Sequence, residues 1–272
     1  MIFVIGATGK VGRHVVSGLL DEGAGVRALA RDPGTAGLPE GVDVVPGDFA
    51  DLHGLEEHME GAEAVFLVWP FFSDEGAADV VDAIARQTKR IVYLSAQAAA
   101  AQPDSFWAAV ERLVERSGAA WTLLRPTGFA ANTRLWADQI RDAGVVRWPY
   151  GEAARSLIDE RDMAAVTVRT LTEDGHDGAR YVLTGPETLT QIEQVHVIGE
   201  AIGRSVRWEE LSREDAREQL AATFGDLPTS ALDAWAAFVE QPEVVTSTVQ
   251  ELTGAPGRRF DQWALDHAED FR

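Results

Sequence analysis

Residues 1–12, MIFVIGATGKVG, decide the fold of this chain. The run from Ile2 to Ile5 is short, apolar and rich in β-branched side chains, which predicts a strand. Seven turn residues follow and lead directly into an amphipathic segment: Gly6, Ala7, Thr8, Gly9, Lys10, Val11 and Gly12. The order of strand, glycine-rich turn and helix is typical of a site for a dinucleotide pyrophosphate, whose oxygens accept from free N–H groups at the helix start.

We expect each of the three glycines of this turn to have a different structural role. Gly6 permits a sharp turn as the chain leaves the strand, and Gly9 lets the backbone approach the phosphates without a Cβ in the way. Gly12 lets the helix pack closely on the sheet. The spacing G-x-x-G-x-x-G differs from the more common G-x-G-x-x-G fingerprint.

Composition narrows the class of protein. The chain has 272 residues, is 46% hydrophobic and contains no cysteine, so disulfides, a thiol nucleophile and cysteine metal sites are excluded. The net charge of −20 repels nucleic acid and anionic membranes. No apolar run approaches the roughly 20 residues of a membrane span. We therefore expect a cytoplasmic protein that binds a small molecule, with its oligomeric state left open.

Strand and helix patterns alternate along the first half of the chain. Strands are expected at residues 26–30, 42–45, 64–68, 90–94 and 121–124, with helices between them at 51–59, 74–86 and 106–116. Such alternation predicts an α/β fold, a Rossmann-type doubly wound parallel sheet. We expect one NAD(P)-binding domain over residues 1–272, with a core at about 1–150. Its small, mostly helical C-terminal substrate lobe is expected mainly at 185–272, with a helix stop at 225–228.

Two positions bear on the choice of cofactor. Arg31 ends the second strand, where NAD-type sites carry an acid, and its guanidinium suits the 2′-phosphate of NADP(H). The alternative is a solvated loop arginine. Lys10 is a second cation that could reach this phosphate, or it is an ordinary helix start. We therefore expect NADP(H) to be preferred over NAD(H).

Further ligand contacts are expected beyond the strand ends. Asp48 either accepts from the adenine amino group, with Phe49 beside the ring, or caps the helix at 51–59. Val68 ends the fourth strand and Trp69 follows it, and both are expected to contact the cofactor. Trp69, Phe71 and Phe72 form either an apolar wall over nicotinamide and substrate or a packed loop.

Ser95 ends the fifth strand and is the candidate catalytic residue. It could contact the cofactor and hold a substrate oxygen, or it is a turn serine, and alone it supplies no general acid near neutral pH. Four later residues are candidate substrate contacts: Phe129, Asn132, Trp136 and Trp148. Asn132 could instead cap a helix at 133–143. The six histidines have no spacing that predicts a metal site.

Several segments together resemble the NmrA-like branch of the atypical short-chain dehydrogenase/reductase superfamily. They are GATGKVG (6–12), VRALARDP (26–33), VVPGDFAD (44–51), RIVYLSA (90–96), ERLVERSGAAWTLLRPTGF (111–129), IDERDMA (158–164) and YVLTGPETLT (181–190). The resemblance implies a Rossmann-type sheet, NADP(H) bound at the glycine turn and Arg31, and a variable C-terminal substrate lobe. Members of the branch are reductases of quinones, imines or secondary metabolites, or cofactor-binding redox regulators.

The chain departs from ordinary short-chain dehydrogenases at the proton donor. Those enzymes pair a tyrosine with a lysine four residues later, but here Tyr93, Tyr150 and Tyr181 are followed at that distance by glutamine, alanine and glycine. The matching positions fall at Pro103 and Trp107. This loss disfavours simple alcohol dehydrogenation. It leaves an NADP(H)-dependent reductase of a quinone, imine or conjugated carbonyl, with a non-catalytic redox sensor or a non-redox isomerase or cyclase as alternatives.

Overall fold

The structure, a computed structural model, describes residues 1–224 and 228–272. Contacts between residues divide the chain into two compact units, each built from three separate segments. Unit 1 comprises Met1–Thr127, Glu160–Leu183 and Thr248–Ala255, and unit 2 comprises Gly128–Asp159, Thr184–Ser247 and Pro256–Arg272. The division of the sequence into a single domain with a lobe stays a prediction.

Unit 1 contains a parallel sheet of seven strands in the order β3-β2-β1-β4-β5-β6-β9. The strands are β1 (Ile2–Ile5), β2 (Val26–Ala30), β3 (Asp43–Pro46), β4 (Ala64–Val68), β5 (Arg90–Leu94), β6 (Ala120–Pro126) and β9 (Ala179–Leu183). Ile2 of β1 pairs with Val26 on one side and Ala64 on the other. The central strands are apolar throughout because both faces of the sheet are covered.

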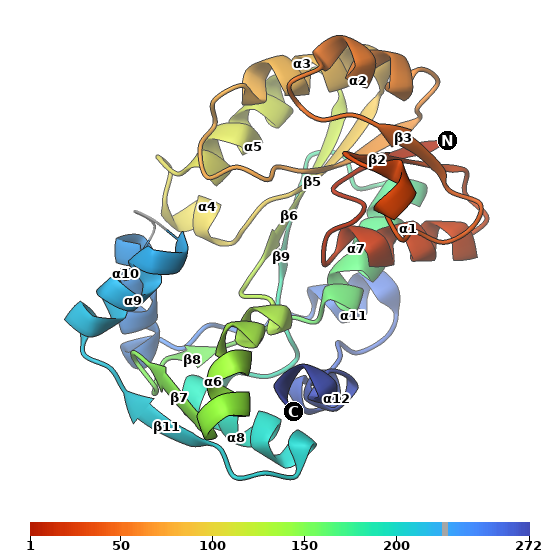
Figure 1. Cartoon of the computed structure of the whole chain (residues 1–272). Helices are drawn as coiled ribbons and strands as arrows, with labels where there is room; N and C mark the ends of the chain where they lie inside the picture. The colour runs from red at the N-terminus through yellow and green to blue at the C-terminus, as the bar shows by residue number, and fades with distance from the viewer. Residues whose placement is uncertain (225–227) are drawn as a thin grey trace. The chain divides into compact units, whose positions relative to one another are not determined.

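Helices cover both faces of this sheet (Figure 1). One face carries α1 (Gly12–Asp21), α7 (Glu160–Thr172) and α11 (Thr248–Thr253), and α7 contacts both of the others. The other carries α2 (Leu52–Met59), α3 (Ala77–Gln87) and α5 (Phe106–Arg116), which share one apolar core with alternate strand residues such as Phe3 and Leu67. The connections contain η1 (Pro33–Thr35) and α4 (Ala98–Ala101). The predicted doubly wound parallel sheet is confirmed.

Strand order reverses between β1 and β4, since β2 and β3 lie to one side and β5, β6 and β9 to the other. In open α/β sheets ligands bind beyond the carboxyl ends of the strands at this point. The residues that follow β1, β4 and β5 are therefore the ones positioned for a ligand. They are the glycine turn, the loop that starts at Trp69, and Ser95.

Unit 2 is mostly helical and carries two small sheets. β7 (Val145–Trp148) pairs in parallel with β11 (Arg207–Glu210), and β8 (Ala154–Arg155) pairs antiparallel with β10 (Leu189–Thr190). Its helices are η2 (Ala130–Trp136), α6 (Ala137–Ala143), α8 (Gln191–Ile202), α9 (Arg213–Phe224), α10 (Pro228–Glu240), α12 (Phe260–Asp266) and η3 (Ala268–Phe271). α8 begins at a capping box of Thr190 and Glu193. The predicted mostly helical C-terminal part is confirmed.

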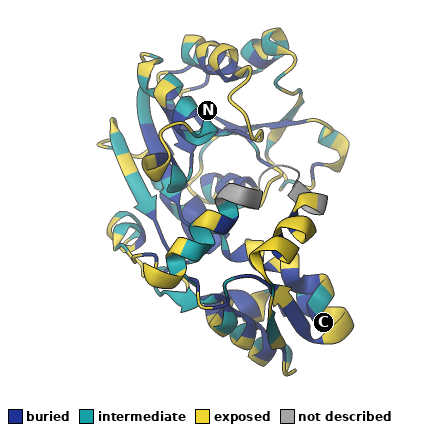
Figure 2. Ribbon diagram, turned by 90° about the vertical axis from the view of Figure 1, so that its left-hand side faces the viewer, coloured by how far each residue is buried: buried dark blue, intermediate teal, exposed yellow. Residues whose placement is uncertain are grey.

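Burial follows the expected patterns in each unit, with buried positions on the strands and on the inner faces of the helices (Figure 2). The predicted helix at 133–143 is wrong in its first half, which is the 3-10 helix η2. The expected helix stop at 225–227 lies outside the described residues. Within residues 1–224 and 228–272, no helix combines the length and apolar character that crossing a membrane requires.

Candidate active site

The glycine turn after β1 has no room for side chains at two of its three glycines. Gly6 has φ +88°, a left-handed conformation that favours glycine, and a Cβ there would lie 2.8 Å from the Cβ of Val68 on β4. A Cβ on Gly12 would lie only 2.0 Å from the carbonyl oxygen of Gly6. The turn is closed by the Gly9 N–H, which donates to that same oxygen over 3.0 Å. This packing agrees with the sharp turn expected at Gly6 and with the close approach of the helix expected at Gly12.

The turn presents unused hydrogen-bond donors. Among the residues that the structure describes, the N–H groups of Thr8, Val11 and Gly12 donate to no carbonyl oxygen, and helical bonding of α1 begins with the Arg13 N–H, which donates to the Gly9 carbonyl over 3.3 Å. The guanidinium of Arg13 donates to the Thr8 carbonyl over 2.9 Å and braces the exposed loop. Unused N–H groups at a helix start attract an anion. A backbone cradle that a Cβ would fill, with free donors, fits a dinucleotide pyrophosphate.

Arg31 follows β2 on the same edge of the sheet. Its side chain is exposed and makes no hydrogen bond or ion pair with any residue in the ranges 1–224 and 228–272. The neighbouring acid is occupied, because the Asp32 carboxylate accepts from the Gly34 N–H over 3.0 Å and from the Thr35 hydroxyl over 2.9 Å. Residues 33–85 contain twelve acidic residues and neither lysine nor arginine. A phosphate bound on this side of the sheet would therefore depend on Arg31 and on the cations of the turn.

The loops after β3 and β4 meet in an aromatic cluster. The Phe49 and Trp69 rings are 5.2 Å apart, Trp69 and Phe71 are 5.1 Å apart, and Phe49 and Phe71 are 5.9 Å apart. The Trp69 indole is buried and donates to the Ser73 carbonyl over 2.7 Å, which closes the loop, while Phe71 is 47% exposed. This arrangement brings together Trp69 and Phe71 but not Phe72, whose contact is with Phe106.

Asp48 is not the helix cap. Its carboxylate accepts from the Ala50 N–H over 2.8 Å, whereas Asp51 caps α2 by accepting from the Gly54 N–H over 3.0 Å. The capping interpretation of Asp48 is therefore wrong, because Asp51, and not Asp48, directly precedes Leu52, the first residue of α2. Asp48 is exposed, and its contact with adenine stays a prediction.

Ser95 is part of a buried polar network that links β5, β6 and α5. Its hydroxyl donates to Glu111 Oε1 over 2.6 Å, and the residue is only 5% exposed. Glu111 in turn pairs with Arg125 at both oxygens, with Nε–Oε1 2.9 Å and Nη2–Oε2 2.6 Å. The bidentate pair raises the pKa of Arg125, chiefly through its hydrogen bond to Glu111. The proton of the Ser95 hydroxyl is thus directed at Glu111.

Tyr93 lies two residues before Ser95 on the same strand and is fully buried. Its hydroxyl has no hydrogen-bond partner among the described residues. Burial raises the pKa of Tyr93 well above its usual value, and the charge of Glu111 adds to the shift. Tyr93 therefore stays protonated and is shielded from solvent.

Residues 6–174, more than half of the chain, match a protein family described as NAD(P)H-binding. The chain belongs to this family. The family match, the Rossmann fold and the relatives identify the chain as a member of the NmrA-like atypical short-chain dehydrogenases/reductases. This confirms the prediction from the sequence. NAD(P)H binding at the glycine turn is consistent with the packing described above.

Two relatives that the chain matches over its full length are named as reductases. The chain is 39% identical to the (4-alkanoyl-5-oxo-2,5-dihydrofuran-3-yl)methyl phosphate reductase of Streptomyces griseus, with 100% of this chain and 99% of the relative covered. It is 34% identical, with the same coverage, to the NAD(P)H azoreductase of Xenophilus azovorans. The NADPH-dependent quinone oxidoreductase of Escherichia coli, complexed with NADPH, has the same fold with a TM-score of 0.84 at 23% identity, over 97% of this chain and 98% of that one.

The four remaining candidates lie in unit 2. Trp136 and Trp148 are buried in its core, with ring centroids 6.2 Å apart, so packing accounts for both without a ligand. Phe129 precedes η2, and Asn132 lies within it, exposed. Asn132 caps no helix, since α6 begins only at Ala137. Their contacts with substrate stay predictions.

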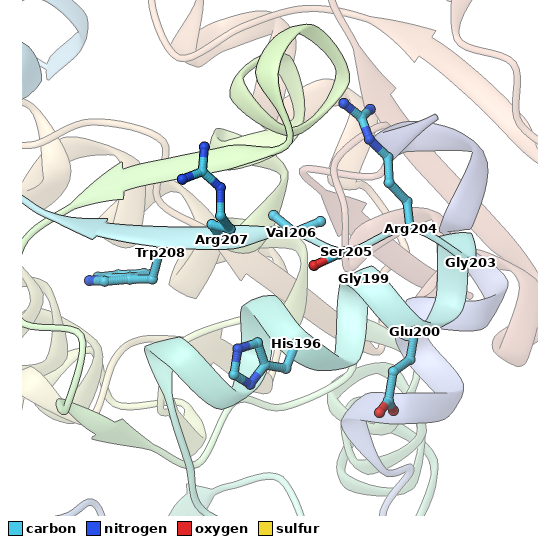
Figure 3. Close-up of a pocket in the computed structure, with 9 residues that line it drawn as sticks. All are labelled: His196, Gly199, Glu200, Gly203, Arg204, Ser205, Val206, Arg207 and Trp208. Carbon is cyan, nitrogen blue, oxygen red and sulfur yellow. The ribbon is translucent and has the colours of Figure 1, made fainter.

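A hollow of about 740 Å³ in unit 2 lies between α8 and β11 (Figure 3). The side chains of Arg204 and Arg207 point to one side of it and those of His196 and Glu200 to the other, so its polar ends do not converge on one ligand atom. In the described part of the chain, no group of three or more histidine or acidic side chains is arranged to hold a metal ion. The candidate site therefore remains at the carboxyl edge of the sheet.

Sequence reasoning missed Glu111 and Arg125. Both lie in the segment that carried the family resemblance, but Glu111 is 16 residues from Ser95 in the chain. One signal was available: an acid on the otherwise apolar face of the helix at 106–116 needs a partner, and an arginine at the end of the next strand supplies one.

Proposed function

We propose that this chain is an NADP(H)-dependent reductase of a conjugated small-molecule acceptor, such as a quinone, an imine or a conjugated carbonyl. The observation that carries the proposal is the glycine turn, whose packing admits no Cβ at Gly6 or Gly12 and whose Val11 and Gly12 N–H groups donate to no carbonyl oxygen among the described residues. The reductases among its relatives support it, since two of them match the chain over its full length.

NADP(H) is the proposed cofactor over NAD(H). Arg31 supports this because its guanidinium is exposed, unpaired among the described residues, and located where the second strand ends. A planar guanidinium binds a phosphate with two parallel hydrogen bonds, which a ribose hydroxyl cannot match. Lys10 in the turn is a second cation for the same phosphate.

When bound, NADPH supplies the hydride, and the chain positions it. The turn would hold the pyrophosphate, and the cluster of Phe49, Trp69 and Phe71 would exclude water beside the cofactor. The chain offers no Tyr-x-x-x-Lys pair, and the Ser95 proton is directed at Glu111. Any proton that completes the reduction is therefore expected from water or from the substrate itself.

Substitution of Arg31 tests the cofactor assignment. We expect Arg31→Asp to weaken NADPH binding about 10- to 150-fold and NADH binding far less, from the loss of about 1.5–3 kcal/mol for a hydrogen bond to a charged group. Isothermal titration calorimetry with each nucleotide measures this. Arg217→Asp on α9 is the matched control, since it is an exposed arginine in unit 2 and changes the net charge equally. Unchanged NADPH affinity in Arg31→Asp would show that the 2′-phosphate assignment is wrong.

Turnover tests the reductase itself. NADPH is incubated with purified protein and a panel of quinones, imines and enones, and loss of the reduced nicotinamide absorbance is followed. Consumption above the protein-free rate supports the proposal. The second candidate is a redox sensor of the same fold, favoured by the missing tyrosine–lysine pair and the occupied Ser95 hydroxyl. Tight NADPH binding with no consumption by any acceptor would favour the sensor.

A further inference from the structure

We propose that the side-chain amide of Gln97 donates a hydrogen bond to the carbonyl oxygen of the acceptor and stabilises the negative charge that forms on that oxygen during hydride transfer. The inference rests on the proposed function. It deepens that function by naming a catalytic residue and by requiring an acceptor with a carbonyl or quinone oxygen. The sequence suggested Ser95 for holding a substrate oxygen, but the Ser95 proton is directed at Glu111.

Gln97 lies at the ligand-binding edge of the sheet, two residues beyond Ser95. Its N–H donates to the Pro126 carbonyl at the end of β6 over 2.9 Å, and the Ser95 N–H donates to the Leu124 carbonyl over 2.8 Å. Gln97 is therefore fixed between the ends of β5 and β6, where the chain passes into α4 (Figure 1). In Rossmann folds the ribose of the adenosine half binds at the end of β2, so the nicotinamide half belongs to β4, β5 and β6.

The amide of Gln97 has unused hydrogen-bonding capacity. It carries two N–H donors and one oxygen acceptor, and the residue is partly buried. The side chain does not cap α4, and it makes no hydrogen bond with any other residue in the ranges 1–224 and 228–272. A partly buried amide without a partner is unfavourable unless water or a ligand supplies one. The oxygen of a bound acceptor would supply it.

Most other side-chain donors beyond β4, β5 and β6, in residues 69–76, 95–107 and 125–127, are engaged or exposed. Five of them donate to protein oxygens: Trp69 to the Ser73 carbonyl, Ser95 to Glu111, Ser105 to the Gln102 carbonyl, Arg125 to Glu111 and Thr127 to the Leu183 carbonyl. Ser73 and Gln102 are exposed. Two partly buried donors remain without a partner among the described residues, the Gln97 amide and the Trp107 indole.

Gln97 is favoured over Trp107 by its position and its chemistry. Trp107 lies in the first turn of α5, and its ring packs 4.2 Å from that of Phe106, whereas Gln97 is bonded to the strand end itself. The amide also offers two N–H groups where the indole offers one. Gln97 is therefore the side chain best placed to bind an oxygen beside the nicotinamide half.

An amide suits an acceptor whose oxygen becomes charged during the reaction. When a hydride from NADPH adds to a conjugated carbonyl or a quinone, a C–H bond forms, the π electrons move to the oxygen, and NADPH becomes NADP⁺. The charged oxygen accepts a hydrogen bond more strongly than the neutral carbonyl does, so a positioned donor lowers the barrier. The amide keeps its own proton because it is a very weak acid, and water protonates the product. This division of tasks requires no Tyr-x-x-x-Lys pair, and the chain contains none.

Gln97→Leu tests the inference because it removes the amide and nearly keeps its size. We expect kcat for reduction of a quinone and of an enone by NADPH to fall about 100-fold, as for loss of one donor to a developing oxyanion. The Kd of NADPH, measured by calorimetry, should stay within about two-fold and shows that the variant is folded. Gln102→Leu makes the same chemical change at an exposed position and is the matched control. A kcat of Gln97→Leu equal to that of the control would overturn the proposal.

Gln97→Glu gives a readout that a purely structural role would not move. A carboxylate has no proton to donate and repels a charged oxygen, whereas the protonated acid donates as the amide does. Because a glutamate carboxyl titrates near pH 4.3, its protonated share rises as the pH falls from 8 to 5. We expect the ratio of kcat in Gln97→Glu to kcat in the original chain to rise at least about five-fold over this range. A ratio independent of pH would contradict the donor role, and this nearly isosteric variant decides the question if Gln97→Leu does not fold.

Trp107→Phe removes the competing donor and keeps an aromatic ring. We expect it to lower kcat less than about three-fold, and a large loss in Trp107→Phe with none in Gln97→Leu would overturn the assignment to Gln97. The proposed function is judged separately. If NADPH binds but no acceptor is reduced by the original chain, the reductase proposal fails and the role of Gln97 fails with it. If the original chain and Gln97→Leu reduce the quinone equally, the function stands and the role of Gln97 is refuted.

Discussion

Gly12→Ala is the sharpest perturbation of the candidate cofactor site. The added Cβ would lie 2.0 Å from the Gly6 carbonyl oxygen and 2.9 Å from the Ala7 Cα, whereas ordinary contacts begin at 3.4 Å. All the atoms in the way are backbone, so no side chain can rotate aside. Either the start of α1 or the turn must therefore move by more than an ångström, and the N–H groups of the turn move with it.

The expected size of the effect differs between folding and binding. Overpacking costs about 1–3 kcal/mol, and alanine recovers up to ~1 kcal/mol as a better helix former than glycine. The free energy of unfolding should therefore fall by about 0–2 kcal/mol. Loss of one hydrogen bond to a charged phosphate costs about 1.5–3 kcal/mol, which weakens NADPH binding roughly 10- to 150-fold.

Calorimetry of NADPH binding and urea unfolding of the same protein measure both quantities. Gly25→Ala is the matched control, because its Cβ would meet nothing closer than 3.9 Å and its backbone is not left-handed. We expect the control to bind NADPH as the original chain does. A folded Gly12→Ala protein with undiminished NADPH affinity would refute the reasoning that this turn cradles the pyrophosphate.

Two further predictions concern the buried network of unit 1. Tyr93→Phe should leave the free energy of unfolding at pH 8 unchanged or raise it, because the tyrosine hydroxyl has no hydrogen-bond partner among the described residues. A lower free energy of unfolding would show that the hydroxyl does have a partner. Burial raises the pKa of Tyr93, so the tyrosine of the unfolded chain loses its proton first as the pH passes about 10. The original chain should therefore lose stability above that pH, and the Tyr93→Phe chain should lose less. Urea unfolding at pH 8 and pH 11 measures both losses. Glu111→Gln leaves Arg125 without its charge partner and should cost about 3–5 kcal/mol in urea unfolding. Glu115→Gln, which breaks the exposed pair with Arg180, should cost less than about 1 kcal/mol, and similar losses in the two variants would contradict the assigned burial.

Elements with strong local signals were predicted well. The helix at 106–116 matches α5 at both ends, because Ser105 caps its first turn, Arg116 lies in its last turn, and one face is apolar. The strands at 2–5, 26–30, 64–68 and 90–94 were found because they are short apolar runs between turns. Their parallel pairing follows from the regular alternation with helices.

Other features depend on contacts that the sequence does not display. Asp48 and Asp51 are both plausible caps, and only the backbone path decides that Asp51 is used. β7 was missed because its partner β11 lies more than 50 residues away in the chain. Phe71 and Phe72 are adjacent in sequence, yet their rings join different clusters. In the same way, the bond from Ser95 to Glu111 required the packing of α5 on the sheet.

The sheet of unit 1 is completed late in synthesis. β6 ends at Pro126, but the strand that covers its outer edge, β9, begins at Ala179, after unit 2 has received its first segment. Until the ribosome has released that strand, the mostly buried strand β6 is the edge of the nascent sheet, and its free N–H and C=O groups can pair with another polypeptide. A stop codon or slow translation between these two strands would therefore produce an intermediate prone to aggregation.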